Sequence, residues 1–340
     1  MKEKQKSAHK NINLGIEILR TILALSIVIR HFLKPEYNTN FLTKLIFHCQ
    51  PFYVPTFFII SFYFSYNTFI SKNILKIKER FIRILIPYTI WPIFLWIINI
   101  INNYRNLVFN IYLFKGIFFQ LLIGFDFYAV LWFQFDLIVI SIIICIIIFL
   151  FRNNYALAIL KSLIPLFFIF NKKYENYLII YKRIGSIKRL SGSFIYSISG
   201  FLLGSISALE NLSNKRKKVF LLIIPVIILV SQYKNIIRIS NRFGIIIIDI
   251  VAIILFFNFA VIPLENYPNN FIKQIIKILT SYTGGIYYIH YGVRSIFSPY
   301  FKIIKNCNLI SCIVNYLLCY FICLIGFRIL KNSKLRYLFI

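Results

Sequence analysis

The stretch GIEILRTILALSIVIRHFL, residues 15–33, is long and apolar enough to cross a bilayer, yet it carries titratable side chains. These are Glu17, Arg20, Arg30 and His31. A charged side chain at the centre of a bilayer costs about 2.5–3.5 kcal/mol on insertion scales, so charges inside such a segment indicate a function. The question for the rest of the chain is what keeps them there.

The composition of the whole chain indicates an integral membrane protein. Of its 340 residues, 59% are hydrophobic and 14% are charged, whereas soluble domains have about 25% charged residues. The net charge of +29 arises from Lys and Arg in short groups between apolar runs. Such grouping is typical of loops that flank membrane helices, and it argues against a nucleic-acid partner.

Ten apolar runs predict an all-α fold, a polytopic membrane helix bundle of about ten transmembrane helices. The predicted spans are 12–33, 52–71, 84–102, 128–150, 154–170, 192–209, 219–233, 243–263, 274–292 and 309–329. The segment 107–124 is interrupted by Lys115, and we expect it to lie at the interface or to re-enter the membrane. Strands are excluded because open sheet edges leave backbone groups unsatisfied in lipid.

These runs predict a single transmembrane domain over residues 12–330, between a basic tail at 1–11 and a C-terminal tail at 331–340. The basic residues around the first spans place both tails in the cytoplasm. The connection 171–191 disagrees, because it would be basic and external. Either a short span nearby is miscounted or these bases bind an anionic partner. The six cysteines have no metal-ligand spacing, so we expect no metal site.

Within the first span, Arg20 and His31 are eleven residues apart. At about 100° and about 1.5 Å per residue, both point to one helix face and lie about 16 Å apart along the axis. Glu17 is placed to pair with Arg20 and to lessen the cost of its burial. We expect both side chains to face a common cavity; the alternative is a structural ion pair and a hydrogen-bonded interfacial histidine.

Polar and aromatic positions in later spans follow in a fixed order. They are Phe57, Phe58 and Ser61 in span two; Arg80, Arg83, Pro87 and Tyr88 at span three; Leu131, Trp132 and Phe133; and Tyr287 to His290 near the end. With Glu17, Arg20 and His31, this series resembles acyltransferase family 3, integral membrane enzymes that O-acetylate surface polysaccharides. Phe62 stands where the family usually has Gly, which puts close helix packing at that point in doubt.

The resemblance implies an enzyme of the bacterial inner membrane that uses acyl-coenzyme A, most commonly acetyl-CoA, as donor and a surface or lipid-linked saccharide as acceptor. His31 is expected to be the general base, because imidazole both takes and returns a proton near neutral pH. Arg80 and Arg83 are expected to hold the donor phosphates. The donor's arm would run past Arg20, oriented by Glu17, to bring the thioester to His31.

The same resemblance makes His290, Tyr287, Trp132 and Ser61 candidates for binding the acceptor. His290 is also the second candidate for the base, and ordinary packing is the alternative for Ser61 and Trp132. A transporter or flippase of lipid-linked sugars is the alternative function, since it would also combine many spans with intramembrane charge. Such proteins usually have repeat halves, and no internal repeat is evident in this sequence.

Overall fold

The computed structural model describes residues 14–33, 41–102, 115, 118, 121, 132–173, 184–205, 248–260, 270–297 and 309–339. Throughout these residues the regular structure is helical and contains no strand, which confirms the all-α prediction for this part of the chain. The helices are α1 (Leu14–Phe32), α2 (Phe41–Ile70), α3 (Ile74–Asn102), α5 (Trp132–Leu150), α6 (Asn153–Lys173), α7 (Ile184–Ser205), Ile248–Ala260, α10 (Asn270–Thr280), α11 (Thr283–Phe297), α13 (Leu309–Leu330) and the short 3-10 helix η3 (Lys334–Leu338).

The ten-span bundle is not confirmed. Within the described residues, α5 and α13 are the helices that are long and apolar enough to cross a membrane, and Ile248–Ala260 is apolar but shorter. Helix α1 is less apolar because Glu17, Arg20 and Arg30 fall within its 19 residues. The predicted span 219–233 lies outside the described residues, and only residues 115, 118 and 121 of the segment 107–124 lie within them.

The span predicted at 274–292 is wrong, because the chain forms two helices there. Helix α10 ends at Thr280 and α11 begins at Thr283, with a turn between them. Hydroxyl groups at the break bond to backbone carbonyls: Thr283 Oγ1 donates to Thr280 O at 2.6 Å, and Ser281 Oγ donates to Lys277 O. Such local bonds compete with a continuous helix, and a hydropathy pattern does not register them.

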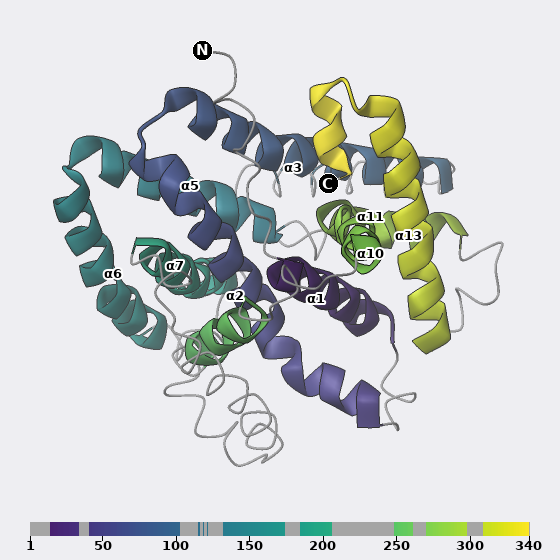
Figure 1. Cartoon of the computed structure of the whole chain (residues 1–340), viewed down its shortest axis with the longest axis horizontal. Coiled ribbons are helices and arrows are strands. Elements are labelled where there is room, and N and C mark those ends of the chain that lie inside the picture. Colours follow the sequence, from purple (N-terminus) through teal and green to yellow (C-terminus); the bar gives the residue numbers. More distant parts are fainter. Residues whose placement is uncertain are drawn as a thin grey trace.

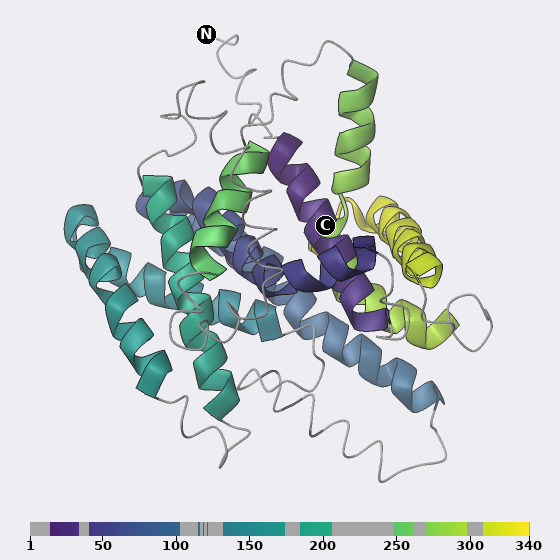
Figure 2. The same ribbon diagram turned by 90° about the horizontal axis from the view of Figure 1, so that it is seen from below.

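Helix α1 lies in the interior of the molecule. In Figures 1 and 2 it runs between α6 and α7 on one side and α13 on the other, and it packs against α2, α10, α11 and α13. Its Leu19, Leu23 and Ile27 belong to an apolar cluster with α2, α5 and α7. Its Val28 and Ile29 belong to a second cluster with α11 and α13. Helix α1 therefore joins the two apolar cores.

Close packing between α2 and α7 depends on glycines of α7. A Cβ placed on Gly200 would be 2.5 Å from the Ile59 carbonyl oxygen, and one on Gly204 would be 3.0 Å from the Tyr63 carbonyl oxygen. Small residues of this kind let helix backbones approach in membrane proteins. Phe62 is fully buried. The close approach of α2 to α7 is therefore made possible by the glycines of α7 opposite Ile59 and Tyr63.

The C-terminal segment packs against the bundle through η3. Trp91 Nε1 of α3 donates a hydrogen bond to Leu338 O at 3.3 Å. A Cβ on Gly285 would be 2.7 Å from the backbone of Phe339, and one on Gly326 would be 2.5 Å from its ring. The lack of side chains on α11 and α13 at these two positions makes room for the end of the chain.

We predict that Gly200→Ala destabilises the protein by about 1–3 kcal/mol, the usual cost of overpacking, because the added methyl group meets backbone that cannot rotate away. Thermal unfolding in detergent micelles measures the change. Gly192→Ala is the matched control, since its nearest neighbour, the Tyr196 ring, would be at an ordinary 3.8 Å. Equal melting temperatures for the two variants would contradict the packing argument.

Candidate functional site

The end of α1 and the middle of α11 bring two histidines together. The Nδ1 of His31 lies 2.7 Å from the Tyr291 hydroxyl oxygen. The rings of His31 and His290 are stacked, with centroids 5.5 Å apart and an interplanar angle of 29°. His31 is exposed and His290 is buried. Both histidines were predicted from the sequence, but their contact and the role of Tyr291 between the helices were not.

The tautomer of neutral His290 follows from its hydrogen bonds. Its Nδ1 lies 2.7 Å from the Tyr287 carbonyl oxygen. A carbonyl oxygen only accepts, so Nδ1 carries the hydrogen and Nε2 carries the lone pair. This Nε2 is buried and has no hydrogen-bond partner among the described residues. Asn315 of α13, missed in the sequence, donates to the His290 carbonyl oxygen at 3.4 Å and ties α11 to α13.

A cationic side chain on α11 covers the end of α1. The Arg294 guanidinium lies 4.3 Å from the centroid of the Phe32 ring, and its Nη1 is 3.5 Å from the Phe32 carbonyl oxygen. The Phe32 ring in turn meets Tyr291 edge-on, at 5.2 Å between centroids. These contacts hold the end of α1 and α11 in register beside the histidines. A lone arginine near the end of an apolar run carried no specific signal of this role.

The predicted ion pair within α1 is present. Arg20 Nη1 lies 3.1 Å from both carboxylate oxygens of Glu17. The common cavity expected along this face stays a prediction; Ala24 and Ile27, on the α1 surface between Arg20 and His31, are buried. Helical periodicity correctly placed Arg20 and His31 on one face of α1. It does not show which neighbouring helices cover the turns between them.

The structure pairs Arg80 with Ser61. Arg80 Nη2 of α3 lies 3.3 Å from Ser61 Oγ of α2, and the rings of Phe62 and Phe69 each lie 5.3 Å from its guanidinium carbon. Cation–π contacts of this kind stabilise a desolvated guanidinium. Arg80 was predicted to bind the donor and Ser61 to bind the acceptor. The two side chains are in contact with each other where α2 meets α3.

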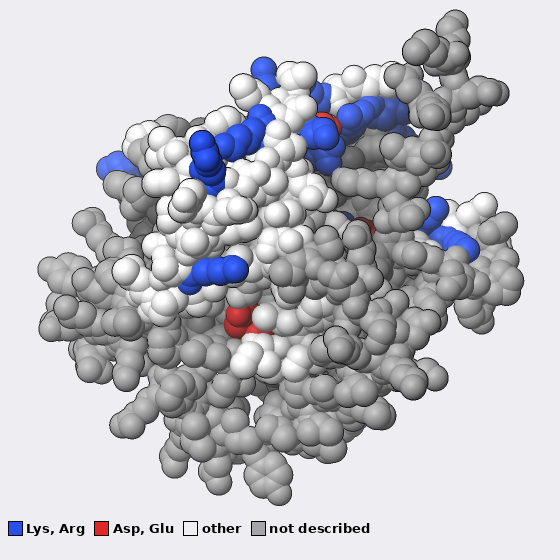
Figure 3. All heavy atoms as spheres, turned by 60° about the vertical axis from the view of Figure 1, so that its left-hand side comes forward, with Lys and Arg blue, Asp and Glu red and all other residues white. Residues whose placement is uncertain are grey.

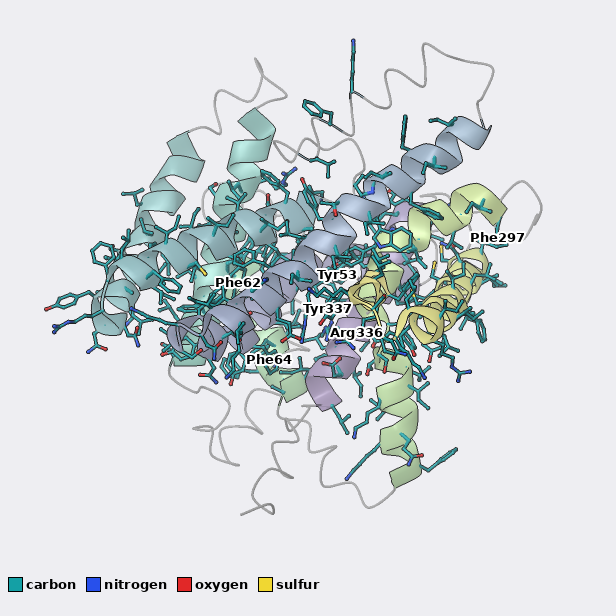
Figure 4. The ribbon with its side chains drawn as sticks, turned by 90° about the horizontal axis from the view of Figure 1, so that it is seen from above. Tyr53, Phe62, Phe64, Phe297, Arg336 and Tyr337 are labelled. Carbon is teal, nitrogen blue, oxygen red and sulfur yellow. The ribbon has the colours of Figure 1, made fainter. Side chains whose placement is uncertain are left out.

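Arg83 remains accessible from the surface. It forms an ion pair with Glu79 and lies over the Tyr337 ring at 5.4 Å from its centroid. The hydrogen bond from Arg83 lowers the pKa of the Glu79 carboxyl, and the Tyr337 hydroxyl donates to the same carboxylate at 3.2 Å. Figure 4 shows Tyr337 and Arg336 beside α3. The C-terminal segment thus covers part of the predicted phosphate site.

Basic side chains surround this end of α3. Lys72, Lys76 and Lys78 are exposed where the chain enters the helix. Figure 3 shows Lys and Arg side chains gathered toward one edge of the face in view. A cationic surface of this kind attracts anionic ligands and lipid headgroups.

A buried charge network joins α5 and α7. Asp136 is fully buried, accepts a hydrogen bond from Ser193 Oγ at 2.8 Å and lies 3.4 Å from Nε and Nη2 of Arg189. The Arg189 guanidinium also lies 4.8 Å from the Trp132 ring centroid. Arg189 was predicted in the connection 171–191, but α7 begins at Ile184 and includes it. Its charge compensates Asp136 and therefore does not belong to a basic loop.

We predict that Asp136→Ala lowers the free energy of unfolding by about 3 kcal/mol, because the Arg189 guanidinium loses its buried carboxylate partner. The measurement is thermal unfolding in detergent micelles. The double variant Asp136→Leu with Arg189→Leu is expected to recover most of the loss, since neither charge then remains. A single variant as stable as the unaltered protein would show that the pair does not hold α5 to α7.

Comparison with known families gives one match. The family model Acyl_transf_3, described as an acyltransferase domain, matches residues 13–336, almost the whole chain. The matched range includes the histidines of α1 and α11, the arginines of α3 and the network between α5 and α7. No curated protein and no solved structure matches the chain. The match does not favour the alternative of a sugar flippase.

Proposed function

We propose that this chain, which belongs to the acyltransferase domain family Acyl_transf_3, moves an acetyl group from acetyl-CoA to a hydroxyl of a surface or lipid-linked saccharide. Family membership makes the protein an acyltransferase, and the long apolar helices α5 and α13 together with the family indicate a membrane protein. The donor, the acceptor and the residues that carry the reaction are our proposal.

The observation that supports the proposal most directly is the pair of histidines in unlike environments. Transfer to a hydroxyl needs a base that substrate can reach. His31 is exposed, whereas His290 is buried beside it with Nδ1 bonded to the Tyr287 carbonyl oxygen. We therefore assign the base to His31. His290, a sequence candidate for binding the acceptor, is buried, so we assign it to the wall of the site, where its ring stacks on that of His31.

The reaction then has a simple proton balance. The acceptor hydroxyl gives its proton to His31 as its oxygen bonds to the thioester carbonyl carbon. The tetrahedral intermediate collapses with cleavage of the carbon–sulfur bond, and the proton on His31 goes to the departing thiolate. No group other than donor, acceptor and imidazole is required, so the products are the O-acetyl ester and free coenzyme A.

The donor phosphates are assigned to Arg83 and the exposed lysines near it. Arg80 serves a different purpose in this proposal: its contacts with Ser61, Phe62 and Phe69 hold α3 to α2. Because Ala24 and Ile27 are buried between Arg20 and His31, a donor arm can pass along this face only if the helices that cover it separate. Arg20, neutralised by Glu17, would then line that path.

Trp132 and Tyr287 are proposed to shape the acceptor side. One contact of the Trp132 ring is already the Arg189 guanidinium, so a sugar would stack on the opposite face. The Tyr287 ring packs against Phe133, with centroids 5.7 Å apart, and against His290 at 6.2 Å. It therefore links the histidine pair to α5.

We predict that His31→Ala reduces acetyl transfer by about 10²–10⁴-fold, the usual contribution of a general base. Thiol release from acetyl-CoA by membranes that contain the protein and its acceptor measures the rate, and the acetyl content of the surface polysaccharide, measured by mass spectrometry, checks the product. The same substitution at His9, which precedes the first predicted span, is the control. Transfer that survives in His31→Ala would refute the assignment of the base.

We predict that Arg83→Ala raises KM for acetyl-CoA about tenfold, since loss of one phosphate contact worth about 1.4 kcal/mol has that effect. The same thiol-release assay at varied acetyl-CoA concentration gives the value. Arg336→Ala is the matched control, because Arg336 lies over the same Tyr337 ring, at 5.2 Å from its centroid. An equal rise in both variants would reflect general loss of charge and would contradict a specific phosphate site.

A further inference from the structure

We propose that Tyr291 is the positioning residue of the base: its hydroxyl oxygen accepts the hydrogen on His31 Nδ1, which leaves the Nε2 lone pair to take the acceptor proton. This inference rests on the proposed function, since it needs His31 to be the base. It is carried by the 2.7 Å distance between Tyr291 Oη and His31 Nδ1, a contact between residues 260 positions apart in the chain.

The Tyr291 side chain is held on several sides, so its hydroxyl has a defined place. Its ring centroid lies 5.2 Å from that of Phe32, 4.8 Å from that of His290 and 5.1 Å from that of His31. Tyrosine loses little conformational freedom when its ring is packed, because two torsion angles define it. A fixed hydroxyl at Nδ1 constrains the rotation of the imidazole about its side-chain bonds.

The backbones that carry the two groups are also tied together. Arg294, one helical turn beyond Tyr291, reaches the Phe32 carbonyl oxygen at 3.5 Å. On the other side of α11, Asn315 donates to the His290 carbonyl oxygen at 3.4 Å. Axial movement of α11 relative to α1 would break the first of these contacts together with the Tyr291 bond. The distance from Tyr291 to His31 is therefore maintained by helix packing rather than by the hydrogen bond alone.

The choice of tautomer follows from the chemistry of the base. Neutral imidazole has one N–H and one lone pair, and a base must present the lone pair to the substrate. Nδ1 faces Tyr291, so a base that acts on the acceptor uses Nε2; its lone pair is then on Nε2 and its hydrogen on Nδ1. A phenol oxygen can accept that hydrogen, and it continues to accept it when Nε2 takes the substrate proton and the ring becomes cationic. Tyr291 thus stabilises the form of His31 that appears during transfer.

The two stacked imidazoles have different roles in this proposal. In neutral His290 the Nδ1 hydrogen is directed to the Tyr287 carbonyl oxygen within its own helix. In His31 the Nδ1 hydrogen is directed to a side chain of another helix. Both rings then carry their lone pair on Nε2; His31 is an exposed residue, whereas the Nε2 of His290 is buried. In the proposed reaction His31 takes the proton from the acceptor, while His290 is the buried ring on which it stacks.

The test is Tyr291→Phe, which removes the hydroxyl and keeps the ring between Phe32 and His290. We expect kcat for thiol release from acetyl-CoA, in membranes that contain the acceptor, to fall about 10–100-fold, the usual effect of removing a group that orients an imidazole ligand. KM for acetyl-CoA is expected to stay within about twofold, because binding does not depend on the tautomer of the base. If Tyr291 had only a structural role, Tyr291→Phe would lower the melting temperature and change both kcat and KM.

Tyr282→Phe is the matched control, since Tyr282 is a buried tyrosine in the turn just before α11 that packs on Tyr320 and Phe327. It is expected to leave kcat unchanged. The substitution Tyr291→Phe made in His31→Ala is expected to cause no further loss, because the hydroxyl acts through His31. A further loss of the same factor in that background would overturn the inference.

The outcomes separate this inference from the proposed function. If His31→Ala abolishes transfer and Tyr291→Phe keeps kcat within about twofold of the unaltered protein, the positioning role is refuted and the base assignment stands. If His31→Ala retains transfer, the base assignment itself fails. Melting temperatures of all variants, measured in the same detergent, show whether a lost rate reflects a lost fold.

Discussion

Two charged side chains inside the helices of this protein, Arg20 and Asp136, are each matched by a side chain of opposite charge, and the positions of these partners bear on how the helices pack. Arg20 is matched within α1 by Glu17. Asp136 of α5 is matched across helices by Arg189 and Ser193 of α7. An unmatched buried charge would cost several kcal/mol. Pairs between helices therefore fix the register of α5 against α7, whereas the pair within α1 leaves that helix to be positioned by its apolar faces.

Those apolar faces give α1 its central place. One side of the helix packs into the core formed with α2, α5 and α7, and the residues near its end pack into the core formed with α11 and α13. His31 lies within this second contact region, between the buried Ile29 and Phe32, but is itself exposed. The base of the proposed reaction is thus on an exposed face of α1, and His290, on which it stacks, is buried on α11.

The same structure separates the proposed ligand regions. The basic residues of α3 lie where the C-terminal segment returns to the bundle, and Tyr337 contacts both Arg83 and Glu79 there. The histidines lie at the other end of α1 from Leu14, in contact with α11. Buried side chains between Arg20 and His31 separate the ends of α1 in this state. In the proposed reaction, a donor arm that passed along this face of α1 would need the helices that cover Ala24 and Ile27 to separate.

The sequence alone determined the helical class, the existence of α1, α5 and α13 close to their observed bounds, the pairing of Glu17 with Arg20, and the order of motifs that placed the chain in its family. These follow from local rules: apolar length, helical periodicity and the spacing of residues within one helix. It did not determine the break at Ser281, where hydroxyl groups bond to the backbone, nor the partners of Asp136 and His31. Arg189 and Tyr291 are 53 and 260 residues from the groups they contact. Only the tertiary structure decided these contacts, because the direction of a side chain on one helix says nothing about which distant helix packs against it.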